Sequence, residues 1–529
     1  MNLPRIASQP RWITLPDMAM EQAERLGEKP ALDFRDRRIS YAGLARNMWR
    51  IFHALRSAGC APGSRVAWFG KNRDVYYELL LGAAAAGVVV VPVNWRLADP
   101  EVEWILRDSE CRIIFATAEF VERIAALALR LPSDVTVIGV DAAEGLAYSD
   151  WRDRQPSTPV TGTTDPDSAV VQLYTSGTTG HPKGALLSQR ALLVFRSIPA
   201  AQQPEWNRWS DDDVSLIVMP QFHIGGTGFG LQTLCSGATG LVEEEFDAGA
   251  VLEAIASRGL SKFFTVPSAI QMLLQHPRVR QIDYSRMRAI VYGASPIPLE
   301  LLREAMDVFR TDFVQQYGMT EMCGTIAVLG PEAHDAAGNP RMLSAGRALP
   351  GVEIAIQAPD GESLPAGVTG EVVIRSPTCM LGYWKMPEAT AAALDPEGWF
   401  HTGDAGYLDE EGYLFLRDRL KDMIVSGGEN VFPAEVENAI FSHPAVREVA
   451  VIGVPDARWG ETVKAVVALH PGAQADAEEI RTWARERIAG FKVPKSVDFI
   501  ASLPRNASGK ILRRELRQPY WAGHDRAIN

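Results

Sequence analysis

The stretch YTSGTTGHPKG (174–184) combines residue types that hold phosphate groups in proteins. It follows the apolar run AVVQL (169–173), which is typical of a buried strand. Glycines allow backbone N–H groups to approach an anion closely, hydroxyl groups donate further hydrogen bonds, and Lys183 adds a positive charge. We therefore expect this loop to hold the β- and γ-phosphates of a nucleotide.

The spacing of this loop differs from that of P-loop nucleotide-binding proteins. Their pattern, G-x-x-x-x-G-K-[ST], places a hydroxyl residue after the lysine, where it binds Mg²⁺. In this chain Lys183 is followed by Gly184. The sequence therefore disfavours a P-loop kinase or ATPase, and a polar Gly/Thr linker is the structural alternative.

Length and charge limit the classes of protein to consider. A chain of 529 residues is expected to form two or more domains. Its net charge of −12 argues against a generic binder of nucleic acids or anionic membranes. The five cysteines are scattered without a C-x-x-C pair, which is typical of buried thiols in a reducing compartment.

Neither a signal peptide nor a membrane span is expected. The first residues include no apolar segment of the signal-peptide kind. The longest apolar run, LLLGAAAAGVVVVPV (79–93), is shorter than the roughly 20 residues that a spanning helix needs. We interpret it as the end of a buried helix followed by a buried strand, and we expect a cytoplasmic protein.

Short Val/Ile-rich runs alternate with helical periodicity along most of the chain, which indicates βαβ units and largely parallel sheets. From about Val352 the pattern changes to strands and turns, and DEEG (409–412) predicts a hairpin. After Asp422 a mixed pattern returns. We predict an N-terminal domain over 1–419 and a C-terminal domain over 420–529. The short runs are 64–70, 87–93, 111–117, 134–140, 213–220, 262–267 and 287–293.

Several motifs together resemble those of the acyl-adenylate-forming superfamily of AMP-binding enzymes. This superfamily includes acyl- and aryl-CoA synthetases, luciferases and the adenylation domains of peptide synthetases. The motifs occur in the family's order and cover essentially the whole chain. They are YTSGTTGHPKGAL (174–186), MPQFHIGG (219–226), VYGASPIP (291–298), QQYGMTE (315–321), SAGRALPG (344–351), GYW (382–384), the region 399–437, GFKVPK (490–495) and LPRNASGKILRREL (503–516).

The resemblance implies that ATP activates a carboxylic acid as an acyl-AMP. Mg²⁺ and fixed donors would stabilise the charge on the α-phosphate and the pyrophosphate. The pyrophosphate portion would be held by Thr175, Ser176, Gly177, Thr178, Thr179, Gly180 and Lys183, and the metal by Thr178 and Glu321.

The same resemblance places the nucleoside. Asp404 would accept hydrogen bonds from the ribose hydroxyls and Arg419 would approach the ribose, although Asp404 alone could equally be a turn residue. Tyr317 would stack on adenine. The remaining residues of this pocket would be Gly293, Ala294, Ser295, Gln316, Gly318, Met319 and Thr320.

Four residues are predicted to be catalytic: Lys510, His223, Glu321 and Lys183. Lys510 would bridge the acyl carboxylate and the α-phosphate, although a lone surface lysine is normally solvated. His223 would gate the acyl pocket beside the carboxylate, or it is a core histidine. No general base is needed, because the carboxylate is already ionised and adenylation depends on positioning and charge stabilisation.

The family also predicts a second half-reaction with CoA. Ser426, Gly427, Gly428 and Glu429 of SGGEN would frame the pantetheine tunnel. Because this segment and Lys510 cannot face the same carbonyl at once, the C-terminal domain must swing, with Lys421 as the hinge. A free-standing adenylation enzyme with a carrier-protein acceptor and a luciferase-like oxygenase are the alternatives.

The acid is less determined by the sequence. The segment after His223 contains Gly225, Gly226, Gly228 and Gly230, which either leave room for a long or wide tunnel or serve close packing. Segments 221–231, 263–269 and 293–296 contain no cation for a second carboxylate and no acid for an α-ammonium group. We expect a hydrophobic monocarboxylic acid, with medium- to long-chain fatty acids ahead of aryl acids.

The expected protein is thus an α/β enzyme that uses ATP, Mg²⁺ and CoA. Its N-terminal part should hold two α/β subdomains and a small β-barrel, followed by a mobile C-terminal α+β domain. No nucleic-acid partner is expected, and a homodimer is left open.

Overall fold

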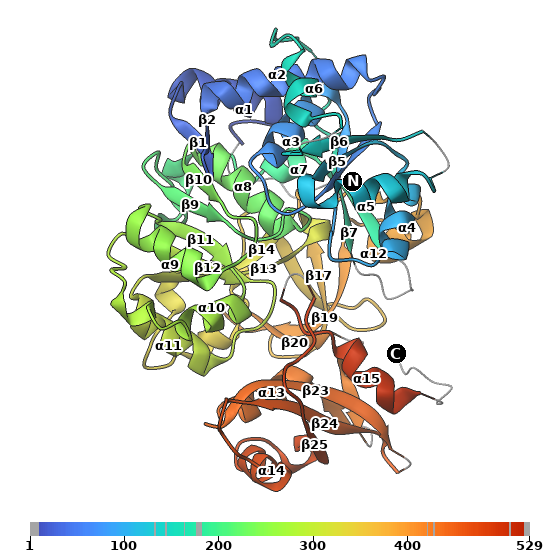
Figure 1. Cartoon of the computed structure of the whole chain (residues 1–529). Helices are drawn as coiled ribbons and strands as arrows, with labels where there is room; N and C mark the ends of the chain where they lie inside the picture. Colours follow the sequence, from blue (N-terminus) through green and yellow to red (C-terminus); the bar gives the residue numbers. More distant parts are fainter. Residues whose placement is uncertain are drawn as a thin grey trace.

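The computed structural model describes residues 10–131, 134–142, 145–162, 164–175, 182–419, 422–426, 429–456, 458–506 and 509–522. The N-terminal part carries two large sheets with helices and a smaller antiparallel sheet. A further sheet with its own helices forms the C-terminal part, drawn in orange and red below the rest (Figure 1). This arrangement confirms the predicted α/β class.

The first large sheet has seven strands in the order β18-β8-β7-β4-β3-β5-β6. Its central strands are parallel, whereas β8 and β18 are antiparallel additions at one edge. The strands are β3 (Arg65–Phe69), β4 (Val89–Val93), β5 (Cys111–Thr117), β6 (Thr136–Val140), β7 (Ala169–Thr175), β8 (Lys183–Ser188) and β18 (Gly382–Tyr383).

The long apolar run divides as predicted into a helix and a strand. Helix α3 (Val75–Ala86) is buried along its whole length, and β4 begins at Val89. Gly87 ends the helix in the left-handed region, with φ of 62°, which glycine adopts without strain. Other helices beside this sheet are α2 (Tyr41–Ser57), α4 (Asp99–Ser109), α5 (Val121–Ala128), α6 (Tyr148–Asp153) and α7 (Gln189–Leu193).

The second large sheet has nine strands in the order β15-β14-β13-β12-β11-β9-β10-β1-β2. The run from β13 to β1 is parallel. The strands are β1 (Pro30–Phe34), β2 (Arg37–Ser40), β9 (Val214–Ile217), β10 (Thr239–Val242), β11 (Lys262–Thr265), β12 (Ala289–Gly293), β13 (Asp312–Met319), β14 (Gly324–Leu329) and β15 (Arg347–Ala348). The associated helices are α1 (Leu15–Leu26), α8 (Ile224–Ser236), α9 (Ala248–Ser257), α10 (Pro267–Leu274) and α11 (Leu299–Phe309).

The predicted small barrel is a half-barrel sheet of four antiparallel strands. They are β16 (Glu353–Gln357), β17 (Gly370–Arg375), β19 (Phe400–Leu408) and β20 (Leu414–Arg419), and α12 (Pro387–Ala393) precedes β19. The predicted DEEG hairpin joins β19 to β20, where Gly412 has φ of 82° and Glu411 N–H donates to Asp409 Oδ1.

The C-terminal part has a five-stranded sheet with its own buried core. Its strands are β21 (Ile424–Ser426), β22 (Glu429–Val431), β23 (Val446–Asp456), β24 (Gly460–Leu469) and β25 (Ser496–Phe499), and its helices are α13 (Pro433–Phe441), α14 (Ala477–Arg485) and α15 (Arg513–Trp521). The half-barrel sheet ends at Arg419 and this sheet begins at Ile424, while the exact boundary at 419/420 stays a prediction.

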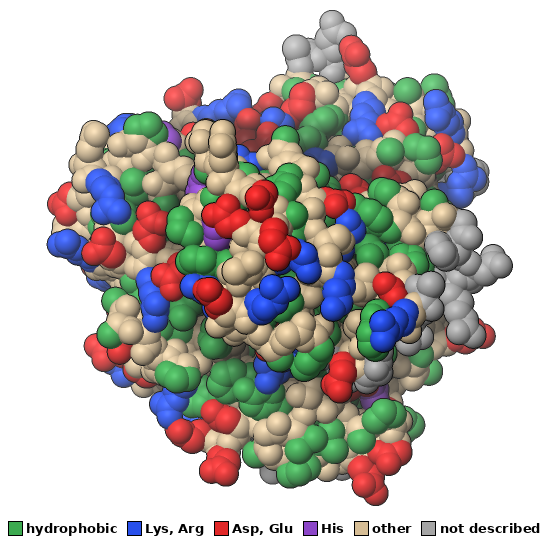
Figure 2. All heavy atoms as spheres, turned by 90° about the horizontal axis from the view of Figure 1, so that it is seen from below, with side chains coloured by type: hydrophobic (Ala, Val, Ile, Leu, Met, Phe, Trp, Pro, Cys, Tyr) green, Lys and Arg blue, Asp and Glu red, His purple; other side chains and the backbone are tan. Residues whose placement is uncertain are grey.

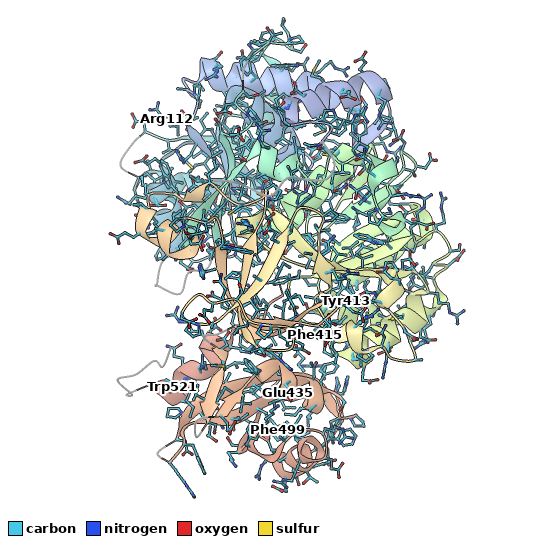
Figure 3. All side chains as sticks on the ribbon, turned by 180° about the vertical axis from the view of Figure 1, so that it is seen from behind. Arg112, Tyr413, Phe415, Glu435, Phe499 and Trp521 are labelled. Carbon is cyan, nitrogen blue, oxygen red and sulfur yellow. The ribbon has the colours of Figure 1, made fainter. Side chains whose placement is uncertain are left out.

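The two parts touch at several points. Gln271 Nε2 in α10 donates to the Arg447 carbonyl at 3.0 Å, and Phe441 of α13 packs against the core beneath the nine-stranded sheet. In Figure 3, Tyr413 and Phe415 of the half-barrel sheet lie next to the C-terminal part, which carries Glu435, Phe499 and Trp521. Figure 2 views the molecule from the C-terminal end and shows acidic and basic side chains interspersed over this face. None of the helices in the described ranges is long and apolar enough to cross a membrane.

Candidate active site

A cavity of about 700 Å³ joins the carboxyl ends of strands from both large sheets. One end lies between the β7–β8 hairpin and the turn that follows β13, and the other lies beside α8 and β11. It therefore connects the predicted phosphate site to the predicted acyl pocket. The predicted residues that line it are Thr175, Lys183, His223, Ala294, Gln316, Gly318, Met319, Thr320 and Glu321.

The predicted phosphate loop joins two antiparallel strands. Thr175 at the end of β7 pairs with Lys183 at the start of β8. The Lys183 ammonium lies 5.0 Å from the centre of the Tyr383 ring. Ser176, Gly177, Thr178, Thr179 and Gly180 lie outside the described residues, so their phosphate-binding roles stay predictions.

Glu321 lies in the 3-10 turn Thr320–Met322, directly after β13. Its Oε1 accepts a hydrogen bond from the Tyr383 hydroxyl at 2.9 Å and a longer one from Thr175 Oγ1 at 3.5 Å. Tyr383 therefore fixes one oxygen of the carboxylate at the cavity wall. Tyr383 belongs to the GYW motif, for which no role was predicted above.

The side-chain oxygens of Glu321 and Thr175 can serve as ligands of a magnesium ion that is held mainly by the phosphates of a nucleotide. Within the described ranges, His, Cys, Asp and Glu form no cluster of three or more that could hold a metal. Mg²⁺ commonly takes one or two carboxylates and completes its shell with phosphate oxygens and water. One carboxylate, Glu321, together with the Thr175 hydroxyl is sufficient for that arrangement.

The predicted nucleoside residues lie at the ends of β12 and β13 and in the middle of β19. Gly293 pairs with Gln316, and a Cβ on Gly293 would lie 2.3 Å from the Gln316 carbonyl oxygen, so only glycine fits. Ala294 follows with φ of 66° and lines the cavity. The Tyr317 hydroxyl donates to Asp404 Oδ2 at 2.5 Å.

Asp404 is buried at 8% exposure, and the Thr402 hydroxyl accepts from its backbone N–H at 3.0 Å. The backbone of Asp404 also pairs with Arg419 across β19 and β20, which brings the two predicted ribose residues to the same ladder position. Ser295 follows Ala294 in the turn after β12. The arrangement offers one well-ordered carboxylate beside Thr402 and Gly403, which line the cavity.

His223 is the N-cap residue of α8 and lines the middle of the cavity. Burial, and secondarily the charge of Arg96, lower its pKa from 6.5 to about 4. The imidazole is therefore neutral at pH 7. Its Nε2 is buried without a hydrogen-bond partner in the described part of the chain, so the ring can bind a polar group of a ligand.

The glycines of α8 differ in what surrounds them. A Cβ on Gly226 would lie 2.3 Å from the Pro220 carbonyl oxygen, and one on Gly230 would lie 2.0 Å from the Tyr77 hydroxyl. These two glycines permit close packing and add no tunnel volume, contrary to one of the two interpretations above. Gly225 and Gly228 line the cavity, but only Gly225 faces an apolar wall: a Cβ added to it would lie 3.1 Å from the Phe264 ring.

Two cations of the cavity wall lie outside the segments that were predicted to form the acyl pocket, 221–231, 263–269 and 293–296. They are Arg196 and Lys262, and both line the cavity. Lys262 Nζ donates to the Arg208 carbonyl at 2.5 Å and lies 3.6 Å from Asp213. No carboxylate of the described residues lies within 4.0 Å of the Arg196 guanidinium, whose hydrogen-bond partners there are backbone carbonyls. The three segments contain no cation, as stated above, but Arg196 and Lys262 bring positive charge to the cavity wall from outside them.

Lys510 lies at the surface, outside the cavity lining that the described residues form. The Lys510 backbone N–H donates to Asn506 Oδ1 at 2.8 Å, and the backbone of Arg505 pairs with that of Ile511 in an isolated antiparallel bridge. A Cβ on Gly509, with φ of 78°, would lie 2.7 Å from Ser268 Oγ. The Lys510 loop therefore contacts the start of α10, whose preceding strand β11 lines the cavity through Phe264.

The predicted CoA segment is only partly described. Ser426 pairs with Glu429 across the turn between β21 and β22. Gly427, Gly428 and the predicted hinge Lys421 lie outside the described residues, and the side chain of Arg419 does too. Their roles stay predictions.

Comparisons with known proteins agree with this site. The AMP-binding enzyme family matches residues 20–384, and the AMP-binding enzyme C-terminal domain matches 435–510. The chain is 41% identical to a fatty acid–[acyl-carrier-protein] ligase, ScoC, of Streptomyces coeruleorubidus, covering 98% of this chain and 99% of that protein. It is also 41% identical to a feruloyl-CoA synthase of an Amycolatopsis species, covering 91% and 94%.

A solved structure extends the likeness to three dimensions. ATP-bound MatB from Rhodopseudomonas palustris matches with a TM-score of 0.86 at 31% identity, covering 96% of this chain and 99% of that one. The two family matches cover most of the residues that line the cavity, and the second match reaches Lys510. The chain therefore belongs to the AMP-binding enzymes of the acyl-adenylate-forming superfamily and is an AMP-forming acid–thiol ligase.

Proposed function

We propose that this enzyme is an acyl-CoA synthetase that activates a hydrophobic monocarboxylic acid with ATP and transfers the acyl group to CoA. The observation that supports this most strongly is the single cavity that runs from Lys183 and Glu321, past His223, to an aromatic end. The aromatic residues at that end are Phe195, Trp206, Trp209, Phe229 and Phe264.

In the first half-reaction the acid's carboxylate attacks the α-phosphorus of ATP, and pyrophosphate leaves. Lys183 and the loop before it bind the departing pyrophosphate, and Glu321 helps to hold Mg²⁺, which stabilises phosphate charge when bound. Asp404 binds the ribose and Ala294 contacts adenine. The neutral His223 ring lies beside the carboxylate without repelling or protonating it.

Lys510 acts in this first step. The contact between Gly509 and Ser268 holds its loop against the N-terminal part, near the β11 end of the cavity. The C-terminal part then rotates about Lys421, so that Lys510 leaves the active site and segment 426–429 takes its place. This movement opens a path for the pantetheine thiol. The thiol sulfur attacks the acyl carbonyl, and AMP leaves.

A second candidate acceptor is the phosphopantetheine thiol of a carrier protein. It is favoured by the near full-length similarity to ScoC, whose name describes an acyl-carrier-protein ligase. The feruloyl-CoA synthase is equally similar in identity, and the SGGEN segment resembles that of CoA-using enzymes. We therefore place CoA first.

The aromatic wall suits both an alkyl chain and an aryl ring, because either gains by removing apolar surface from water. The packing roles of Gly226 and Gly230 remove the volume argument that placed fatty acids ahead of aryl acids. We therefore propose both as the substrate class.

One experiment tests the activity and the acceptor together. The purified enzyme is given ATP, Mg²⁺ and a panel of fatty and aryl acids, with CoA, with a holo carrier protein, or with neither. AMP and thioester are then measured. We expect AMP and acyl-CoA from at least one hydrophobic acid. ADP as the product would refute the adenylation mechanism, and thioester formed on the carrier protein alone would replace CoA as the acceptor.

A further inference from the structure

Arg196 is a charged residue inside the acyl end of the cavity. It lies in the turn after α7 and lines the cavity beside α8. Its guanidinium donates hydrogen bonds to three backbone carbonyls: Nη1 to Leu192 at 2.6 Å, Nε to Gly228 at 2.9 Å and Nη2 to Cys323 at 2.9 Å. It therefore joins α7, the pocket helix α8 and the turn that carries Glu321.

This charge has no counter-ion. In the described part of the chain, no Asp or Glu oxygen lies within 4.0 Å of the Arg196 guanidinium, unlike the neighbouring cavity cation Lys262 with Asp213. Burial accordingly lowers the pKa of Arg196. A buried charge is costly unless a paired charge or strong hydrogen bonds compensate it, and neutral carbonyls compensate it only in part.

The surrounding backbone is adapted to this side chain. A Cβ on Gly228 would lie 2.3 Å from Arg196 Nη2, and one on Gly324 would lie 3.1 Å from the same atom. Two glycines on separate elements, α8 and β14, thus leave the space that the guanidinium occupies. Gly228 of the pocket helix therefore has its physical reason here rather than in an empty tunnel.

The Arg196 guanidinium also has N–H groups that none of these three carbonyls accepts from. Arginine carries five N–H groups, and three of them are used by the carbonyls above. Because Arg196 forms part of the cavity wall, the others can reach a ligand. His223 is another polar residue of this wall with hydrogen-bonding capacity for a ligand, because its buried Nε2 has no hydrogen-bond partner among the described residues.

We propose that Arg196 selects acids that carry a hydrogen-bond-accepting oxygen on the chain or ring, beyond the reacting carboxylate. A hydroxyl, keto or ether oxygen, or a second carboxylate, would complete the donors of the guanidinium in the acyl pocket. This proposal rests on the acid-activating function proposed above and names an oxygen-bearing substrate class for the same cavity, which extends to dicarboxylic acids.

A pocket that donates a hydrogen bond to a substrate oxygen discriminates strongly against the analogue that lacks it, because the donor is then left unpaired. Loss of a hydrogen bond to a charged group corresponds to a change of roughly ten- to a hundred-fold. Matched acids with and without an additional oxygen-bearing group therefore report on Arg196 directly. Examples are cinnamate with 4-hydroxycinnamate and 4-methoxycinnamate, and decanoate with hydroxydecanoate and decanedioate.

The test measures kcat/KM for AMP formation with each pair in the wild type, Arg196→Met, Arg196→Lys and the control Arg190→Met. Arg190 lies on α7, just before the turn that carries Arg196, and pairs with Asp167 at the surface. We expect the wild type and the control to prefer an oxygen-bearing acid. Arg196→Met should lose that preference by about ten- to a hundred-fold, and Arg196→Lys should retain part of it.

A structural role alone predicts a different result. If Arg196 only holds Leu192, Gly228 and Cys323 together, both acids of every pair lose activity by the same factor, and the proposal is wrong. Preference for decanedioate over hydroxydecanoate would support Arg196 and would overturn the monocarboxylic part of the proposed function. If the wild type forms AMP equally well with both acids of each pair, the proposed selectivity of Arg196 is wrong, whereas the proposed acid-activating function stands.

Binding to the wild-type enzyme decides the matter if the Arg196 variants do not fold. Calorimetry with each acid pair, in the presence of a non-hydrolysable ATP analogue, measures the preference without mutation or turnover. Tighter binding of the oxygen-bearing member supports the proposal even if no acid is turned over. Equal affinities across all pairs overturn it.

Discussion

The Tyr317 hydroxyl donates a 2.5 Å hydrogen bond to Asp404 Oδ2, which links the end of β13 to β19. The residue predicted to stack on adenine thus orients the residue predicted to bind ribose. Tyr317→Phe keeps the ring and removes this bond. We expect KM for ATP to rise about two- to ten-fold, since a neutral donor to a carboxylate contributes on the order of 1 kcal/mol. Tyr407→Phe, on the same strand as Asp404, is the control and should leave KM unchanged.

Lys183→Ala should slow adenylation at low ATP, because a charge-assisted contact with the pyrophosphate portion is lost. The expected effect on kcat/KM for ATP is about ten- to a hundred-fold. Lys385→Ala is a matched control, because Lys385 binds the Asp108 carbonyl and Glu110 instead of lining the cavity. Unchanged kinetics in Lys183→Ala would remove this residue from the phosphate site.

Lys510→Ala separates the two half-reactions. Formation of acyl-AMP from acid and ATP should be nearly abolished, whereas thioester formation from synthetic acyl-AMP should persist, because AMP is already attached. Arg514→Ala, an exposed residue just beyond the loop, should affect neither step. An equal loss in both steps would indicate that Lys510 supports the loop or acts twice.

The neutral state of His223 predicts a dependence of stability on pH. The pKa of His223 is about 4 in the folded state and about 6.5 in the unfolded state. Between these two pH values the imidazole is therefore protonated in the unfolded chain and neutral in the folded chain. The free energy of unfolding should therefore fall between pH 6.5 and pH 4, by about 3 kcal/mol from this residue.

Urea unfolding of the wild type and His223→Asn at pH 7.5 and pH 4 measures this contribution. The variant should lose less stability on acidification, because all other titrating groups are shared. Parallel losses in the two proteins would mean that His223 is accessible to water and titrates normally when folded.

The two kinds of glycine in α8 give opposite results on substitution. Gly225→Val should fill cavity volume near Phe264 and shift preference towards smaller acids without changing KM for ATP. Gly226→Ala should lower stability by about 1–3 kcal/mol and affect all acids alike, because its Cβ would meet the Pro220 carbonyl. A chain-length shift in Gly226→Ala instead would return this glycine to the tunnel wall.

The sequence could predict those parts of the site that are encoded in local spacing. Lys183, Glu321 and Asp404 each lie within a short motif, and the family resemblance of that motif gives each residue its predicted role. Arg196 could not be found in this way, because its partners at Leu192, Gly228 and Cys323 come from three separate segments. The roles of Gly226 and Gly230 likewise depend on Pro220 and Tyr77, which only the folded chain brings to them.

The described chain on both sides of the phosphate loop is strand, since β7 ends at Thr175 and β8 begins at Lys183. In a strand–loop–helix arrangement the bound anion also gains from the partial positive charge at the N-terminus of the helix that follows the loop, through the aligned peptide dipoles. Here the described element that follows the loop is the strand β8, which brings no such dipole. The anion must be neutralised by a point charge, and the one at the base of this hairpin is Lys183, which Tyr383 covers on one side. Increasing ionic strength should therefore weaken binding of the pyrophosphate portion more steeply than is usual for a loop that begins a helix.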